Sequence, residues 1–196
     1  DAYAAQAPIY NAVYWSIVNS TIILSMLDKE RHLEETHRMA AGLPYPNPVV
    51  DIHPLELSVI ALADFYLNRA EFEQNGLVAP VYFNKAISLL EKTGVFKNAP
   101  DTARLDRLAN AYFSLGTYTM LLNKPAEAAQ QFSACVQAAQ QLLSTATDDT
   151  QESLLSRTSN LLNRAYQELG YARLLEGKAA EARRASHAAL DATEAP

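Results

Sequence analysis

The chain of 196 residues has few of the residues that catalytic and metal sites commonly require: a single cysteine, Cys135, and only six glycines. One cysteine excludes an intramolecular disulfide and a cysteine-based zinc cluster. The sequence contains no glycine-rich phosphate loop, no Gly-x-Ser-x-Gly motif and no kinase signature. We therefore expect a protein that is not an enzyme and that needs no cofactor.

Charge is also sparse, because charged residues make up 19% of the chain and form no block of one sign. The formal net charge of −6 argues against nucleic acid or an anionic membrane surface as the main partner, since either needs a basic patch. Apolar residues make up 49%, which is typical of a globular protein. We expect a folded domain with a sizeable core and no nucleic-acid partner.

The first part of the chain, residues 2–27, carries no charge at all. Its run from 9 to 27 is rich in large apolar side chains, but asparagine, serine and threonine interrupt it. These polar groups are costly in lipid. We predict that residues 1–42 hold an apolar helix packed on the rest of the chain. The alternative is a membrane span, so any membrane contact is expected through residues 9–27.

The sequence begins with Asp1 rather than methionine, and no basic segment precedes the apolar run. We interpret this as a processed chain. It favours a bacterial envelope or periplasmic location, with the cytoplasm as the alternative.

Proline and glycine divide the remainder into helix-length segments. Apolar and small side chains recur every three or four residues within these segments, as in Ala128, Phe132, Cys135, Ala139 and Leu142. No comparable window alternates with a period of two. We predict an all-α protein of about seven helices, with antiparallel hairpins at 54–75/80–93, 100–122/125–144 and 150–176/178–192.

Two of these hairpins are near-copies of each other. A shift of 54 residues aligns Leu115-Gly116 with Leu169-Gly170, and Ala126-Glu127-Ala128 with Ala180-Glu181-Ala182. A weaker copy lies upstream, at Leu62, Ala63 and Tyr66 and then at Phe83, Ala86 and Ile87. A small residue on the first helix lets the second helix approach closely, and the aromatic residue fills the remaining space. The repeat therefore predicts hairpins that stack in chain order.

This pattern resembles the tetratricopeptide repeat family over residues 54–192. An aromatic residue followed by Leu-Gly, then Ala, an aromatic and a small residue in the second helix, agrees with the family. The units here are longer than the family's repeat of about 34 residues. Ser186 replaces the expected aromatic in the last copy, and Thr119 and Arg173 replace an expected large apolar residue. The resemblance implies an α-solenoid with a concave groove that binds another protein or a peptide.

Two candidate sites are weak in the sequence. His32 and His37 are five residues apart and lie about 140° apart around a helix, so they cannot share a metal. A solvated face with Glu34 and Arg38 as an ion pair is the interpretation that we prefer, and no metal site is expected. Cys135 lies in a stripe of small residues, which predicts a buried and unreactive thiol.

The resemblance also suggests a site for the terminal carboxylate of a peptide, which the family holds with Lys, Asn and Arg. The matching positions here are Ile60, Asp64, Ser114, Arg164 and Glu168. Only Arg164 has the required charge, so we do not expect a carboxylate clamp.

The positions that the motif leaves free are the candidates for partner binding. They fall three to four residues apart on the first helices of two hairpins, so they are predicted to line one groove. They are Asn110, Phe113, Ser114, Thr117, Arg164, Gln167, Glu168 and Tyr171. We expect Phe113 and Tyr171 to be the anchors and Arg164 to pair with an acidic group, whereas the competing interpretation places both aromatics in the core.

The sequence is consistent with two classes of function. The first is a scaffold or adaptor that binds a protein or peptide segment without chemistry of its own. The alternative is a small-molecule-binding or accessory subunit of an envelope or transport complex, with a pocket between the long helices.

Overall fold

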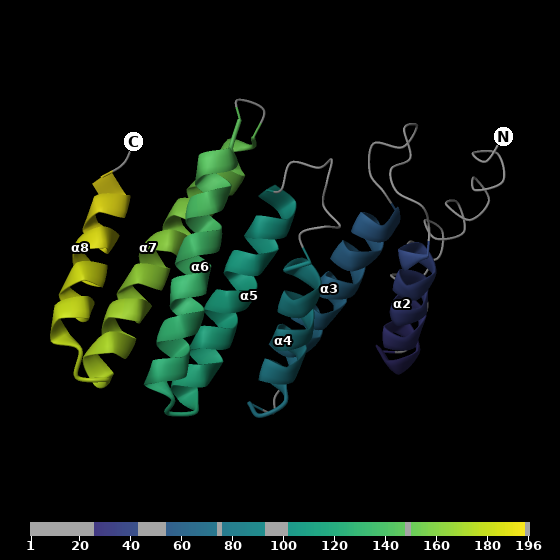
Figure 1. Ribbon diagram of the computed structural model, residues 1–196, viewed down its shortest axis with the longest axis horizontal. Coiled ribbons are helices and arrows are strands. Elements are labelled where there is room, and N and C mark those ends of the chain that lie inside the picture. The colour runs from purple at the N-terminus through teal and green to yellow at the C-terminus, as the bar shows by residue number, and fades with distance from the viewer. Residues whose placement is uncertain (1–25, 43–53, 74–75, 93–101, 148–149, 195–196) are drawn as a thin grey trace.

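The computed structural model describes residues 26–42, 54–73, 76–92, 102–147 and 150–194. These parts contain seven α-helices and no strand, and the all-α prediction is confirmed (Figure 1). The helices are α2 (Met26–Ala41), α3 (Pro54–Phe72), α4 (Ala79–Leu90), α5 (Thr102–Leu121), α6 (Pro125–Thr145), α7 (Glu152–Leu175) and α8 (Ala179–Glu194). The bounds of the six helices after residue 54 lie within three residues of the predicted ones.

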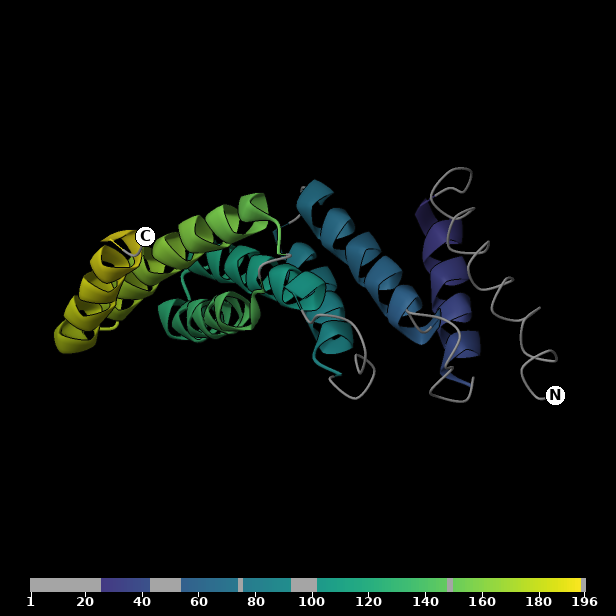
Figure 2. The ribbon, with the colours of Figure 1, turned by 90° about the horizontal axis from the view of Figure 1, so that it is seen from above.

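The last six helices form three hairpins, α3/α4, α5/α6 and α7/α8, and these stack in chain order (Figures 1 and 2). Helix α4 packs on α5, and α6 packs on α7. The predicted α-solenoid is confirmed, whereas membership of the tetratricopeptide family stays a prediction. Contacts of α3 with α5 and of α5 with α7 bring the first helices together along one side, called the first-helix face below.

The tight turns of the second and third hairpins have the same geometry. Asn123 and Gly177, which are 54 residues apart, both have positive φ angles, of 58° and 78°. The next residue donates its backbone N–H back into the helix, from Lys124 to the Thr119 carbonyl and from Lys178 to the Arg173 carbonyl. This is the usual way to end a helix with a left-handed residue. The repeat therefore fixes the connection as well as the helices.

The core of the middle hairpin depends on a contact between Gly116 and Phe132. A Cβ atom at Gly116 would lie 2.7 Å from Cε1 of the Phe132 ring, so only glycine admits the ring at this place. Phe132 is fully buried, as are Ala128 and Cys135 on the same helix. Burial raises the pKa of the Cys135 thiol to about 12, so the thiol stays protonated, as the sequence predicts for a packing residue.

Helix α2 packs on α3 through its buried residues Leu33 and Ala40. The predicted apolar helix over 9–27 falls almost wholly outside the described residues, and its packing stays a prediction. Among the helices that the structure describes, none combines the length and the apolar character that crossing a membrane requires.

Truncating Phe132 to alanine should lower the stability of the whole stack. A buried Phe→Ala change costs about 3–5 kcal/mol, which for a chain of this size lowers the melting temperature by roughly 6–20 °C. Thermal unfolding followed by circular dichroism measures the change. Leu121→Ala, at an exposed position on α5, is the matched control and should leave the melting temperature nearly unchanged. Equal effects from the two variants would contradict the central place of the ring in the core.

Candidate functional site

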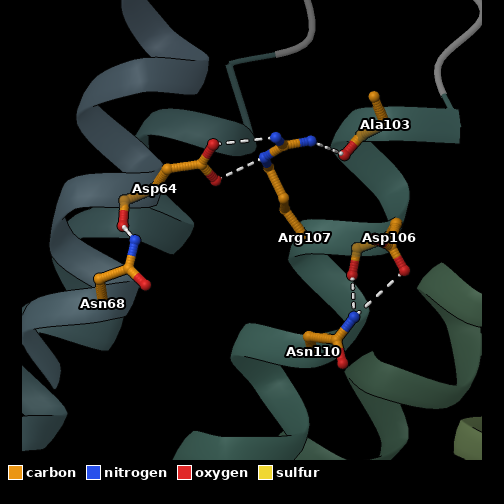
Figure 3. A network of polar contacts seen from close by, with 6 residues as sticks. All are labelled: Asp64, Asn68, Ala103, Asp106, Arg107 and Asn110. Carbon is orange, nitrogen blue, oxygen red and sulfur yellow. Dashed lines mark hydrogen bonds and ion pairs between the residues drawn. The ribbon is translucent and has the colours of Figure 1, made fainter. Parts of the chain in front are cut away.

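The first-helix face is held together at its α3–α5 junction by an ion pair between Asp64 and Arg107 (Figure 3). The pair is bidentate, with Arg107 Nε 2.6 Å from Asp64 Oδ1 and Nη2 2.9 Å from Oδ2. The third guanidinium nitrogen donates to the Ala103 carbonyl, and Asn68 donates to the Asp64 carbonyl. The hydrogen bonds to Asp64 raise the pKa of Arg107. Asp64 is thus neutralised within the chain.

At the α5–α7 junction of the same face, Arg164 lies over the ring of Phe113. The Arg164 Cζ atom is 4.6 Å from the ring centroid, which is cation–π geometry. The ring also meets Phe132 edge-on, with centroids 5.7 Å apart. Arg164 is exposed and forms no ion pair with any carboxylate in the parts of the chain that the structure describes.

The other predicted groove residues lie on α5 and α7 with different degrees of exposure. Asn110, Thr117, Gln167 and Tyr171 are exposed, whereas Ser114 and Glu168 are half-buried, as Phe113 is. The polar members make bonds within their own helix: Asn110 to Asp106, Thr117 to the Phe113 carbonyl, and Gln167 to Asn163. Phe113 and Arg164 are brought into contact, while Gln167 and Tyr171 line a separate hollow between α7 and α8. Their role in binding stays a prediction.

A site that the sequence did not indicate lies between α2 and α4, across α3. It is a mainly apolar hollow of about 630 Å³. Its lining consists of Glu34, His37, Leu62, Tyr66, Val81, Asn84, Lys85, Ser88 and Leu89. The volume falls within the range of about 300–1,000 Å³ that small-molecule sites have.

The polar part of this hollow is a cluster around Lys85. Its Nζ atom lies 2.8 Å from Glu30 Oε1, 3.9 Å from Glu34 Oε1 and 4.7 Å from the centroid of the Tyr66 ring. The Tyr66 hydroxyl donates to Glu34. Burial raises the pKa of Tyr66, and the bond to Glu34 raises it further. The cluster therefore joins three helices: Lys85 of α4 pairs with two carboxylates of α2, and Tyr66 of α3 is hydrogen-bonded to one of them.

The predicted Glu34–Arg38 ion pair is wrong, whereas Glu34, Glu35 and Arg38 are exposed, as the prediction of a solvated face expects. Glu34 bonds across the helix interface instead, and Arg38 lies 3.5 Å from Glu35. The partners Tyr66 and Lys85 are far along the chain, so no local spacing could have indicated them.

His37 is half-buried in the same hollow and its proton can be placed. Its Nδ1 atom is 3.1 Å from Ser58 Oγ, and that hydroxyl donates its single hydrogen to the Leu55 carbonyl at 2.8 Å. Nδ1 must therefore carry a hydrogen and donate to Ser58. Burial lowers the pKa of His37, and the charge of Lys92 lowers it further. Within the described residues no cluster of His, Cys, Asp and Glu is suited to a metal ion.

The depressed pKa of His37 predicts a loss of stability in mild acid. Between the lowered folded value and the ordinary value of 6.5, the unfolded chain binds more protons than the folded one. The contribution of His37 to the free energy of unfolding is thus complete above pH 6.5, and it is lost as the pH falls through the pKa of His37 in the folded state. The free energy of urea unfolding, measured from about pH 7.5 to 5.5, should fall less steeply in His37→Asn than in the wild type. The variant His187→Asn, at an exposed position, should keep the wild-type slope, and a parallel slope in His37→Asn would contradict the assignment.

Comparison with known proteins gives only distant similarities. No protein-family model and no curated protein matches the chain. It is similar to the crystal structure of BtubC (BKLC) from P. vanneervenii, with 14% identity over 98% of this chain and 84% of that chain, and a TM-score of 0.41. It is also similar to the crystal structure of MamA, with 18% identity over 88% of this chain and 97% of that chain, and a TM-score of 0.24. Similarity at this level identifies no function.

Proposed function

We propose that the chain is a scaffold that holds a segment of another protein on its first-helix face and carries out no reaction. The observation that carries this proposal is the Phe113–Arg164 pair. An exposed arginine over an aromatic ring offers a flat apolar surface together with several N–H donors. Aromatic and arginine side chains are the commonest anchors of protein interfaces.

The charge of Arg164 is available to a partner. Two other arginines on the first helices are paired, Arg107 with Asp64 and Arg173 with Glu176 and Glu181. Glu168 lies one turn from Arg164 on α7, yet the two form no ion pair. Because Asp64 is already neutralised by Arg107, the α5–α7 junction favours a segment that carries a carboxylate.

Exposed amide and hydroxyl groups surround the pair. Asn110 and Thr117, one turn to either side of Phe113 on α5, offer donors and acceptors that suit the backbone of a bound peptide. Hydrogen bonds of this kind fix the position of a segment, while the arginine selects its charge. We therefore propose an acidic peptide or helix as the partner.

Replacing Arg164 should remove binding without affecting the fold. In a peptide display library selected on the immobilised chain, we expect enrichment of sequences with Asp or Glu. The selected peptides should bind Arg164→Gln at least tenfold more weakly, because a hydrogen bond to a charged group contributes about 1.5–3 kcal/mol. The melting temperature should change little, since Arg164 is exposed.

The matched control is Arg157→Gln, two turns earlier on α7 and also exposed. It removes the same charge from the same helix away from Phe113, and should bind the selected peptides as the wild type does. Equal weakening in both variants would mean that net charge alone attracts the peptides. Selected peptides without acidic residues would overturn the proposal.

A second candidate function is the binding of a small molecule in the hollow between α2 and α4. Its size, its apolar lining and the polar groups of Glu34, His37 and Lys85 favour it. A ligand there would place an apolar body against Leu62 and Val81 and a polar end near the Lys85 cluster. This would make the chain a ligand-binding subunit, which is the alternative that the sequence left open.

Filling the hollow tests this second function. If a metabolite library raises the melting temperature of the wild type, Val81→Trp should abolish the shift, since Val81 lines the hollow and is exposed enough to be enlarged without strain. Leu77→Trp, an exposed position outside the lining, should keep it. A shift that persists in Val81→Trp would assign the ligand to another place.

A further inference from the structure

The last hairpin contains a hollow of about 550 Å³ between α7 and α8, distinct from the Phe113–Arg164 pair. It is lined by Gln167, Gly170, Tyr171, Leu174, Ala179, Ala182, Arg183, Ser186 and His187. The internal repeat explains what this hollow is.

A shift of 54 residues relates the hollow to a filled part of the middle hairpin. There, a buried cluster combines residues of α5 and α6 with Leu169 and Ala172 of α7. Its five members from α5 and α6 all correspond to residues that line the hollow: Phe113, Met120, Ala128, Ala129 and Phe132 match Gln167, Leu174, Ala182, Arg183 and Ser186. The hollow is therefore the place where another helix would pack, if one were present as α7 is.

The two aromatic rings that fill the middle cluster are missing from the last hairpin. Ser186 stands where Phe132 fills the space over Gly116, and Gln167 stands in place of Phe113. Gly170 is the counterpart of Gly116. A Cβ atom at Gly170 would lie 3.3 Å from the Ala182 carbonyl oxygen and 3.4 Å from Ser186 Oγ. Gly170 thus allows α8 to approach α7 closely, and the hollow lies beside this contact, without the two rings that fill the middle hairpin.

A polar cap that merely ends the solenoid does not account for the apolar residues that remain here. Leu190 is 62% exposed, whereas its counterpart Val136, covered in the stack, is 7% exposed. Leu174 is 57% exposed, whereas its counterpart Met120 is half-buried. An end that only needs to be soluble would carry polar residues at both places. The face keeps apolar side chains where the middle hairpin is covered by the next helix.

The rim of the hollow is basic. Arg183 and His187 replace Ala129 and Ser133 of the middle hairpin. Both are exposed, and neither forms an ion pair with a carboxylate of the described residues. The last hairpin therefore carries the charge of Arg183 at the edge of an apolar surface, where the middle hairpin has an alanine, and this charge favours an acidic occupant.

We propose that the outer face of α7/α8 is a docking site for an amphipathic helix of a second protein. The helix takes the place that α7 holds on α5/α6, which continues the stacking interface of the solenoid. It inserts an aromatic side chain over Gly170 and Ser186, against Leu174 and Leu190, and it sets an aspartate or glutamate against Arg183.

Synthetic helices can test this site with the full chain. The probe is a fluorescent, hydrocarbon-stapled peptide with the sequence of residues 155–175, which is the helix that packs on α5/α6. Ala172→Phe supplies the aromatic ring. A glutamate is placed where the peptide would face Arg183. Fluorescence anisotropy should show at least tenfold tighter binding than for the same peptide with Ala172 kept. Equal affinity of the two peptides would overturn the proposal.

Variants of the protein then locate the binding. Ser186→Phe fills the hollow from within, as Phe132 does, and should weaken the probe at least tenfold while preserving or raising the melting temperature. Ser144→Phe, at an exposed position on α6, should bind normally. Undiminished binding by Ser186→Phe would place the probe elsewhere. Arg164→Gln should also bind the probe normally, which separates this site from the proposed function.

The charge of the rim supplies an independent measurement if Ser186→Phe does not fold. Arg183→Glu should bind the glutamate probe more weakly than the wild type does, and should bind tightly again when the glutamate of the peptide is replaced by lysine. Arg184→Glu, in which the changed residue lines another hollow, should show neither effect. Absence of this exchange would contradict the assigned orientation.

Light scattering tests the other occupant: dimerisation of the wild type that Ser186→Phe removes would show that a second copy, and not another protein, fills the site.

Discussion

The whole stack depends on how closely two helices of a hairpin can approach, and the contact between Gly116 and the Phe132 ring sets this distance in the middle hairpin. Glycine opens the space, the ring fills it, and the ring then becomes part of the surface on which Leu169 and Ala172 pack. One contact thus joins packing within the hairpin to packing between hairpins. Left-handed residues at Asn123 and Gly177 set both turns, so the return helix starts in the same register in each copy.

Features that arise from short-range spacing could be predicted from the sequence. The helices were indicated to within a few residues by the period of the apolar stripes and by the prolines and glycines. The repeated Leu-Gly indicated the role of the small side chains. The polar contacts between helices could not be predicted. Asp64 meets Arg107, and Tyr66 meets Glu34, across 43 and 32 residues. Which polar side chains meet depends on how far one hairpin slides along the next, and large apolar contacts set that offset.

The candidate site shows a related limit of reasoning from a repeat. The repeat motif leaves the position of Phe113 free, and positions needed for stacking are expected to be alike in every copy. The structure shows that Phe113 packs on Phe132 as well as beneath Arg164. The two aromatics occur together in the middle hairpin and are both absent from the last one. A position that varies between copies can therefore still take part in packing, provided that its neighbour varies with it.

The distribution of charge in the last hairpin distinguishes its two sides. Toward α6, Arg173 takes the place of Thr119, which is buried and bonded to the Leu115 carbonyl, yet its charge is balanced by Glu176 and Glu181. Lys178 and Arg173 in turn keep the pKa of Glu176 below its ordinary value. On the outer side, Arg183 and His187 have no such partners among the described residues, although they border apolar surface. The need to solvate charged side chains does not explain why Arg173 is paired and Arg183 is not, because both sides of the hairpin are close to water. Arg173 is neutralised beside α6, whereas Arg183 stays unpaired next to apolar surface, and an unpaired charge in that position suits a surface that meets an oppositely charged partner.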